Sequence, residues 1–173
     1  MKLSAFLNIA NSKDEEQKEA AFFAVKYSRK SKARDVYGIG KLTEKTFYEV
    51  KELQRIFSTS FEASINAAID LCPERDPNVF DFFAHYNYIR KEIEEVNERE
   101  MLLSYDPTVE EEAAGIEVFG KFGYFGQIRS IAKQYGWALE YVKELPYSTA
   151  FTILLYDKEE ADFNKRLMKI RNK

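Results

Sequence analysis

The side chains that could carry acid–base or nucleophilic chemistry are few in this sequence. Its 173 residues include one histidine and one cysteine. A Ser-His-Asp or Cys-His mechanism would need His85 as its base. His85 lies one residue away from an apolar helical stripe, and Asp81, four residues earlier, is placed to pair with it on the helix surface. We therefore interpret His85 as a boundary histidine with a local ion pair.

The remaining candidate ligands indicate no metal or cofactor site. A single cysteine excludes an intrachain disulfide and a multi-cysteine zinc site, and a single histidine excludes His-His metal motifs. Cys72 precedes Pro73 at a predicted helix end, where we expect a small buried thiol. Glutamates gather at 92–98 and 110–112, but no Asp/Asn-rich loop supplies further oxygens for a hard cation. These glutamates are expected to form a solvated helix face and an acidic first turn.

Glycine patterns for phosphate binding are also missing. The sequence contains neither Gly-Lys-Ser/Thr nor Gly-x-Gly-x-x-Gly. Gly120, Gly123 and Gly126 recur at three-residue intervals without a preceding strand, so we expect them to permit tight turns or close helix approach. The sequence therefore predicts a protein that is not an enzyme and holds no cofactor.

Residues 128–142 match a helix-turn-helix template. The matching positions are Ala132, Gly136 and Val142. Reading DNA would also need donors on the second helix and basic contacts to phosphates. That helix carries two glutamates and Lys143, a balance that repels phosphates. Basic residues around Arg29 and in the tail 165–173 keep DNA binding as an alternative, but the net charge of −3 makes a nucleic-acid partner unlikely on balance.

The elements that must position these residues are predicted to be helices. The chain has only 7 glycines and 4 prolines, which disfavours a turn-rich all-β fold. The clearest element is a long helix after Asp76-Pro77. Its apolar stripe consists of Val79, Phe82, Phe83, Tyr86, Ile89, Ile93 and Val96. We predict an all-α fold: a compact multi-helix domain with one long central helix and a C-terminal group of short helices.

Capping signals predict where the helices begin. The expected caps are Ser12, Thr43, Asp76, Thr108 and Ser148, of which Ser12 and Thr108 have the capping-box spacing to Glu15 and Glu111. The first of these helices should run from Lys13 into the twenties, with a stripe of Ala20, Phe23, Ala24 and Tyr27. The segment 152–156 could be a buried strand, but the helical pattern after it favours a helix.

Pro107 is the best internal boundary. It separates an N-terminal helical region, 1–106, from a C-terminal helical region, 107–173, which we expect to pack as one compact unit. No stretch approaches the roughly 18 consecutive apolar residues of a membrane span. The segment 3–10 lacks a clean signal-peptidase pattern, and with a single cysteine a reducing cytoplasm is the expected location.

Aromatic residues make up 15% of the chain: fourteen Phe, eleven Tyr and one Trp. Most should fill the core, but so many also make a protein-binding surface plausible. Glycines at 120, 123 and 126 limit how well a regular helix could bury the aromatics between them, and Trp137 follows a helix-capping glycine. The predicted partner-binding residues are Phe119, Phe122, Tyr124, Phe125, Trp137 and Tyr141. The alternative is that all six pack between the C-terminal helices.

The region from Pro107 onward resembles the phage tail assembly chaperones, small helical proteins encoded next to the tail tape-measure protein. The resemblance rests on an acidic capped helix, Phe119-Gly120-Lys121-Phe122-Gly123, a short helix to Tyr135-Gly136, and Trp137 through Tyr147 with Tyr141-Val142-Lys143-Glu144-Leu145-Pro146. It implies binding to hydrophobic or coiled-coil segments of the tape-measure protein in the host cytoplasm, self-association, and no catalytic residues. Residues 1–106 stay unassigned. A helix-turn-helix DNA-associated regulator and a virion structural adaptor are the alternatives.

Overall fold

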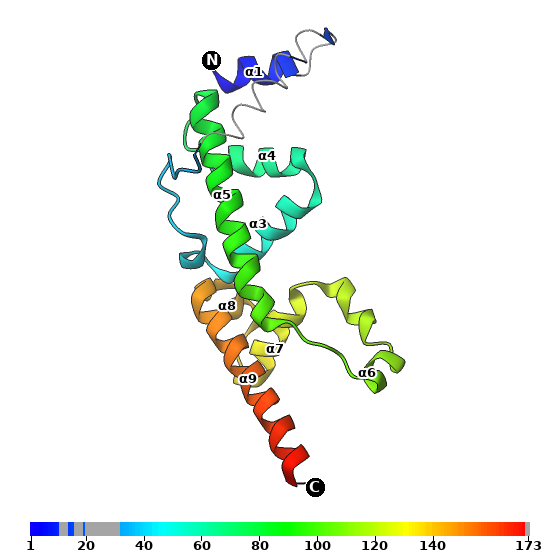
Figure 1. The fold of residues 1–173 in the computed structure, drawn as a ribbon. Helices are drawn as coiled ribbons and strands as arrows, with labels where there is room; N and C mark the ends of the chain where they lie inside the picture. The colour runs from blue at the N-terminus through cyan, green and yellow to red at the C-terminus, as the bar shows by residue number, and fades with distance from the viewer. Residues whose placement is uncertain (11–13, 16–18, 20–31, 172–173) are drawn as a thin grey trace. The chain divides into compact units, whose positions relative to one another are not determined.

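The computed structural model describes residues 1–10, 14, 15, 19 and 32–171. Over these residues the fold is all-α, which confirms the predicted class (Figure 1). Extended pairing in the described part of the chain is limited to isolated antiparallel bridges, Lys2 with Asn78 and Thr46 with Pro146. Most of the helix predicted from Lys13 into the twenties lies outside the described residues, including Ala20, Phe23, Ala24 and Tyr27, and so do the basic residues Lys26, Arg29 and Lys30.

The chain forms two compact units that are each discontinuous in sequence. The N-terminal unit comprises residues 1–42 and 53–94, and the C-terminal unit comprises residues 43–52 and 95–173. This grouping differs from the expected division at Pro107. It does so because packing, rather than a proline or a change in composition, decides which segments group together.

Within the described residues, four helices supply the N-terminal unit. They are α1 (Leu3–Ala10), most of α3 (Phe47–Thr59), α4 (Phe61–Asp70) and most of α5 (Val79–Glu100). All seven residues of the apolar stripe predicted for α5 are buried, from Val79 to Val96. Aromatic edges meet in this core, for example Phe6 and Phe83 with ring centroids 5.7 Å apart. The buried face of α5 predicted from the helical spacing of its apolar residues is therefore confirmed.

The cap predicted for α5 belongs to a different helix. Asn78, not Asp76, lies at the start of α5, and its Oδ1 accepts the N–H of Phe80 at 2.9 Å. The Asp76 carboxylate instead accepts the backbone N–H of Ser4 at 2.9 Å and its hydroxyl at 3.0 Å, in the first turn of α1. These hydrogen bonds lower the pKa of Asp76. A carboxylate can satisfy the free amides of any helix start within reach, so sequence proximity misassigned it.

The helix predicted to follow Thr43 begins later. Residues Leu42–Glu44 form a short 3₁₀ helix, η1, and α3 begins at Phe47. Thr46 and Glu49 cap it reciprocally: the N–H of Thr46 donates to Glu49 Oε2 at 2.9 Å, and the N–H of Glu49 donates to Thr46 Oγ1 at 3.2 Å. The hydrogen bonds from Thr46 lower the pKa of Glu49. The true cap therefore has the Thr-x-x-Glu spacing of a capping box, which Thr43 lacks.

The C-terminal unit holds several short helical segments and one long helix. The short segments are η2 (Met101–Leu103), α6 (Val109–Ala113), η3 (Ile116–Phe122), α7 (Phe125–Tyr135) and α8 (Leu139–Glu144). The long helix is α9 (Tyr147–Arg171), which also shows that segment 152–156 is helical rather than a strand. The Thr108–Glu111 capping box at the start of α6 is present as predicted.

Three polar side chains, Lys51, Glu100 and Tyr147, interact within the C-terminal unit. Lys51 Nζ lies 2.6 Å from Glu100 Oε2, and the hydroxyl of Tyr147 donates to Glu100 Oε1 at 2.8 Å. Lys51 is only 6% exposed and Tyr147 is completely buried. Phe47 stacks on Tyr147 with centroids 6.1 Å apart, and the Glu100 side chain is 18% exposed, so the ion pair lies at the edge of the core with its ammonium buried.

Candidate functional site

All three phenylalanines that the sequence predicts to bind a partner are exposed to solvent. Phe119 and Phe122, both in η3, are 66% and 50% exposed, and Phe125, the first residue of α7, is 41% exposed. Val118 beside them is 51% exposed. We call these four residues the phenylalanine ridge. Large apolar side chains that remain half open to water are candidates for contact with another protein.

The backbone explains why the ridge is not buried. Side chains three residues apart eclipse each other along a 3₁₀ helix, so Phe119 and Phe122 project from the same side of η3. Gly123 then ends η3 with a φ of +51°, a conformation that L side chains rarely adopt. The chain turns here before it could form an amphipathic α-helix with a continuous buried face. This agrees with the expectation that the glycines prevent regular helical burial.

Tyr124 is placed differently from its neighbours. It is half-buried, its hydroxyl donates to the Glu52 carboxylate, and its ring meets the edge of Tyr48 with centroids 6.3 Å apart. Its side chain thus ties the start of α7 to α3 residues of the same unit. Among the six predicted binding residues, Tyr124 is the one with a clear structural role.

Trp137 and Tyr141 lie together in an aromatic cluster that includes a residue the sequence analysis did not single out. Tyr135 stacks on Trp137 with centroids 4.9 Å apart, and Trp137 meets Tyr141 edge to face at 5.1 Å. Tyr135 is 41% and Tyr141 is 53% exposed. We call these three residues the tyrosine–tryptophan cluster. The signal that could have identified Tyr135 is its position directly before the capping glycine.

Helix capping positions this cluster. Gly136 adopts a φ of +67° after α7, and the N–H of the next residue, Trp137, donates to the carbonyl of Ala132 at 3.0 Å. This six-to-one hydrogen bond is the Schellman motif, which commonly ends a helix at glycine. This turn brings Tyr135, the last residue of α7, next to Trp137, which in turn contacts Tyr141 of α8. Phe125 of the ridge and Tyr135 of the cluster are the first and last residues of α7, about 15 Å apart along its axis.

The segment α7–Gly136–α8 has the helix-turn-helix order that the sequence predicts. The exposed charged residues of α8 are Glu140 and Glu144. Lys143 is half-buried, with its Nζ 5.9 Å from the ring centroid of Tyr48. The exposed carboxylates of α8 repel phosphates, and the ammonium of Lys143 lies near an aromatic ring.

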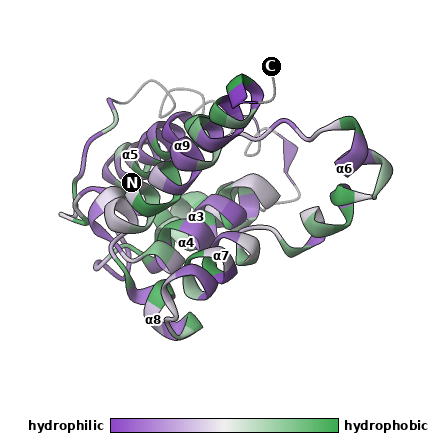
Figure 2. Ribbon diagram, turned by 90° about the horizontal axis from the view of Figure 1, so that it is seen from below, coloured by the Kyte–Doolittle hydropathy of each residue, from purple (hydrophilic) through white to green (hydrophobic). Residues whose placement is uncertain are grey.

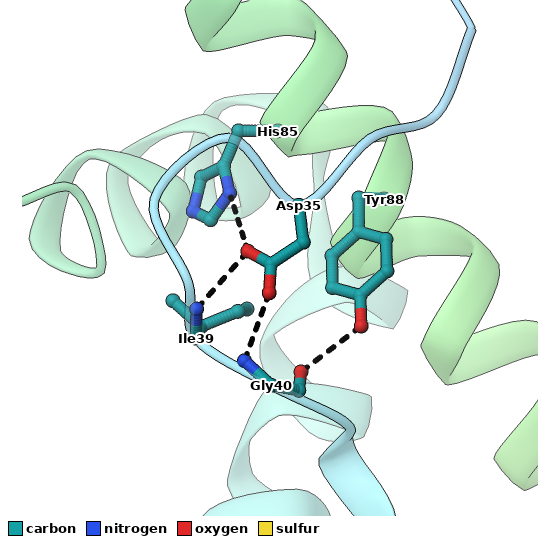
Figure 3. A network of polar contacts seen from close by, with 5 residues as sticks. All are labelled: Asp35, Ile39, Gly40, His85 and Tyr88. Atoms are coloured by element: carbon teal, nitrogen blue, oxygen red, sulfur yellow. Dashed lines mark hydrogen bonds and ion pairs between the residues drawn. The ribbon is translucent and has the colours of Figure 1, made fainter.

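A polar arrangement in the N-terminal unit surrounds His85 of α5 (Figure 3). Both oxygens of Asp35 accept backbone amides, from Ile39 and Gly40, at 3.0 Å each. The hydroxyl of Tyr88 donates to the carbonyl of Gly40 at 3.1 Å, and His85 Nδ1 lies 4.0 Å from Asp35 Oδ1. Asp35 thus holds the loop 35–40 in shape, and Tyr88 ties that loop to α5.

The structure corrects two expectations about His85. Its side chain is fully buried, whereas a boundary position was expected, because the loop 35–40 lies against this part of α5. Asp81 does not pair with it but lies 3.0 Å from Arg34 Nη2. Among the described residues neither ring nitrogen of His85 has a hydrogen-bond partner. Burial lowers the pKa of His85, and the charge of Asp35 opposes this shift only in part.

The lowered pKa of His85 predicts a loss of stability in mild acid. The unfolded histidine takes up a proton near pH 6.5 and the folded one only at lower pH, so stability present above about pH 6.5 falls as the pH drops toward the folded pKa. Urea unfolding followed by circular dichroism should show a decrease of about 1 kcal/mol between about pH 7.5 and about pH 5.5. His85→Gln, which cannot be protonated, should lack most of this decrease. Equal pH dependence in both proteins would rule out His85 as its cause.

Cys72 and Glu92, two other candidate metal ligands, have environments that differ from those expected. Cys72 is half-buried rather than buried, with its Sγ 3.5 Å from the carbonyl of Glu74. Glu92, expected on a solvated face, is buried and accepts the N–H of Leu42 at 3.0 Å. In the described part of the chain, no three His, Cys, Asp or Glu side chains are arranged to hold a metal ion.

No helix within the described residues combines the length and apolar character needed to cross a membrane. Comparison with protein-family models, with curated proteins and with solved structures gives no match for this chain.

Proposed function

We propose that this chain is a non-enzymatic phage tail assembly chaperone that binds hydrophobic helical segments of the tape-measure protein during tail morphogenesis. The observation that carries the proposal is the exposure of the phenylalanine ridge, with Phe119, Phe122 and Phe125 between 41% and 66% exposed. The resemblance of residues 107–173 to such chaperones supplies the identity of the partner.

The ridge offers an amount of apolar surface suited to reversible binding. The exposed parts of its three phenylalanines amount to about 300 Å². At about 25 cal/mol per Å², covering them gains about 7 kcal/mol before the cost of association is subtracted. That cost is of similar size, so the ridge alone would give weak binding and further contacts would be needed for micromolar affinity. A chaperone that must release its client during assembly works in this range.

The tyrosine–tryptophan cluster is the second contact of the proposed surface. Trp and Tyr are common energetic anchors in protein interfaces. An amphipathic helix that touched both the ridge and the cluster would need to span about 15 Å, which corresponds to about three helical turns. We therefore expect the client segment to be a helix with an apolar stripe of at least this length.

Binding should weaken at least about tenfold when the ridge is made polar. The variant Phe119→Ser/Phe122→Ser removes two exposed rings that make little contribution to the core, so its fold should be retained. Its affinity is measured by titrating helical fragments of candidate tape-measure proteins and recording the fluorescence of Trp137, the one tryptophan present. Isothermal calorimetry gives an independent value of the same affinity.

Phe80→Ser is the matched control. Phe80 is 59% exposed and belongs to the N-terminal unit, so the same chemical change there should leave the affinity unaltered. Trp137→Ala tests the cluster by calorimetry and should also weaken binding. The proposal fails if no tape-measure fragment binds, or if the ridge variant binds as tightly as the unaltered protein.

The two alternative functions make different predictions. A DNA-associated regulator would bind a duplex in a strongly salt-dependent way and would lose that binding on Lys143→Glu. A virion structural adaptor would remain in purified mature particles, whereas a chaperone should be absent from them. Mass spectrometry of particles and a duplex titration at physiological salt therefore distinguish the three functions.

A further inference from the structure

The C-terminal part of α9 carries an apolar stripe that is exposed along its length. Tyr156, Phe163, Leu167 and Ile170 are 60%, 55%, 36% and 70% exposed. Their spacings of seven, four and three residues place them on one face of the helix. Hydrophobic residues continue to the C-terminal end of α9 in Figure 2. A stripe of this length on a helix surface is typical of a helix that packs against another one.

Most contacts of α9 inside the C-terminal unit involve its first half, and in its second half Lys165 Nζ lies 4.7 Å from the ring centroid of Tyr105, on the side of the helix away from the stripe. Tyr147 and Ala150, in its first turn, are buried, and Phe151 stacks on Tyr147 with centroids 6.0 Å apart. The helix also contacts α7 and η2. From residue 163 to residue 171, by contrast, every residue is exposed. The second half of the stripe is therefore available for a partner.

The charges beside the stripe indicate which partner fits. Four charged residues flank the stripe within about 90° of it: Glu159 and Glu160 come first along the helix, and Arg166 and Arg171 follow. A second α9 in parallel orientation would place like charges together. In antiparallel orientation the acidic block of one helix lies opposite the basic block of the other, which is the arrangement that charges beside a helix interface favour.

We propose that α9 pairs with α9 of a second copy of this chain in antiparallel orientation, centred on Phe163. A two-fold axis at Phe163 sets the two Phe163 rings opposite each other and places Tyr156 of one copy opposite Ile170 of the other. In the same register Glu159 comes within one residue of the position opposite Arg166. One symmetric arrangement therefore pairs apolar residues with apolar residues and acidic residues with basic residues.

The size of the stripe sets the strength of this association. From residue 156 to residue 170 the helix is about 21 Å long. Pairing two such segments would bury about 1,000 Å² in total, the low end for specific interfaces. The dimer should therefore be weak and concentration-dependent. The stripe begins beside the tyrosine–tryptophan cluster, because Tyr156 lies near Tyr135. The pairing is argued from the exposure and charges of α9 alone, so the inference does not rest on the proposed function.

Sedimentation velocity over protein concentrations from about 1 to about 100 μM tests the pairing. The unaltered protein should shift from monomer to dimer across this range, and Phe163→Glu should weaken the dimer at least about tenfold. Met168→Glu is the matched control, because Met168 is on the same helix and 58% exposed but lies about 120° away from the stripe. That variant should dimerise like the unaltered protein.

A charge exchange tests the orientation. Glu159→Arg and Arg166→Glu should each weaken the dimer because each places like charges together, and the double variant should restore it. In a parallel dimer Glu159 would face Glu159 of the second copy, and Arg166 would face Arg166. The change in dimerisation free energy of the double variant would then equal the sum of the changes in the two single variants. A protein that stays monomeric throughout, equal effects of Phe163→Glu and Met168→Glu, or no restoration by the double variant would each overturn the proposal.

Discussion

Glu100→Ala should destabilise the C-terminal unit by about 3 kcal/mol or more. The Glu100 carboxylate lies 2.6 Å from the buried ammonium of Lys51 and accepts the hydroxyl of Tyr147 at 2.8 Å. Truncation would leave a buried charge without this carboxylate and a buried hydroxyl without this acceptor. Removing one member of a buried ion pair costs far more than the intact pair contributes, because the remaining charge keeps its desolvation penalty.

A double variant separates the lost charge from the lost volume. Lys51→Met with Glu100→Ala removes both charges, so it should recover a large part of the stability that Glu100→Ala alone loses. Tyr147→Phe removes only the hydroxyl and should cost about 1 kcal/mol. Urea unfolding followed by Trp137 fluorescence measures this unit, to which the single tryptophan belongs. A loss below about 1 kcal/mol for Glu100→Ala, or no recovery in the double variant, would contradict a buried ion pair.

Asp35→Ala should open the loop 35–40 of the N-terminal unit at a cost of about 2 kcal/mol. Each oxygen of Asp35 accepts one backbone amide, from Ile39 and from Gly40, and both hydrogen bonds are partly buried. Without the carboxylate these amides lose their acceptors. The loop would then keep the hydrogen bond from Tyr88 to Gly40, which is longer at 3.1 Å.

Hydrogen exchange measured by mass spectrometry reports this loop directly. A loss of about 2 kcal/mol corresponds to amide exchange about thirtyfold faster over residues 34–42. Asp35→Asn keeps one acceptor oxygen and should give an intermediate rate. Unchanged exchange in Asp35→Ala would show that the amides are protected by something other than this side chain. Loss of the Asp35 charge also removes the influence that raises the pKa of His85, so the acid-induced loss of stability should extend to lower pH.

Several elements could be predicted because their signals are local. The buried stripe of α5 follows from a seven-residue pattern on one helix, and each of its members is buried. The Thr108–Glu111 box forms because both partners lie within four residues of each other. The glycines of the segment from Phe119 to Phe125 predict an interrupted helix, and η3 does end at Gly123. Periodicity, capping and glycine conformation all act over a few residues, so they can be read from the chain.

Other features depended on residues far apart in the sequence. Asp76 caps α1 through Ser4, 72 residues away, although its neighbours suggested a cap for α5. Glu92 was expected in solvent, yet it is buried and bonded to the amide of Leu42, 50 residues away. A side chain's environment is set by what packs against it, and no local pattern contains that information.

The amino-acid pattern alone was sufficient to predict the all-α class, the buried face of α5 and the capping box at Thr108. It left open whether the aromatic residues from Phe119 onward pack in the core. The folded arrangement shows that Tyr124 is tied to Glu52 while Phe119 and Phe122 are exposed, and that Tyr135 joins Trp137 and Tyr141. This difference follows from the range over which the interactions act. Backbone conformation responds to near neighbours, whereas burial and polar pairing require partners that folding brings together.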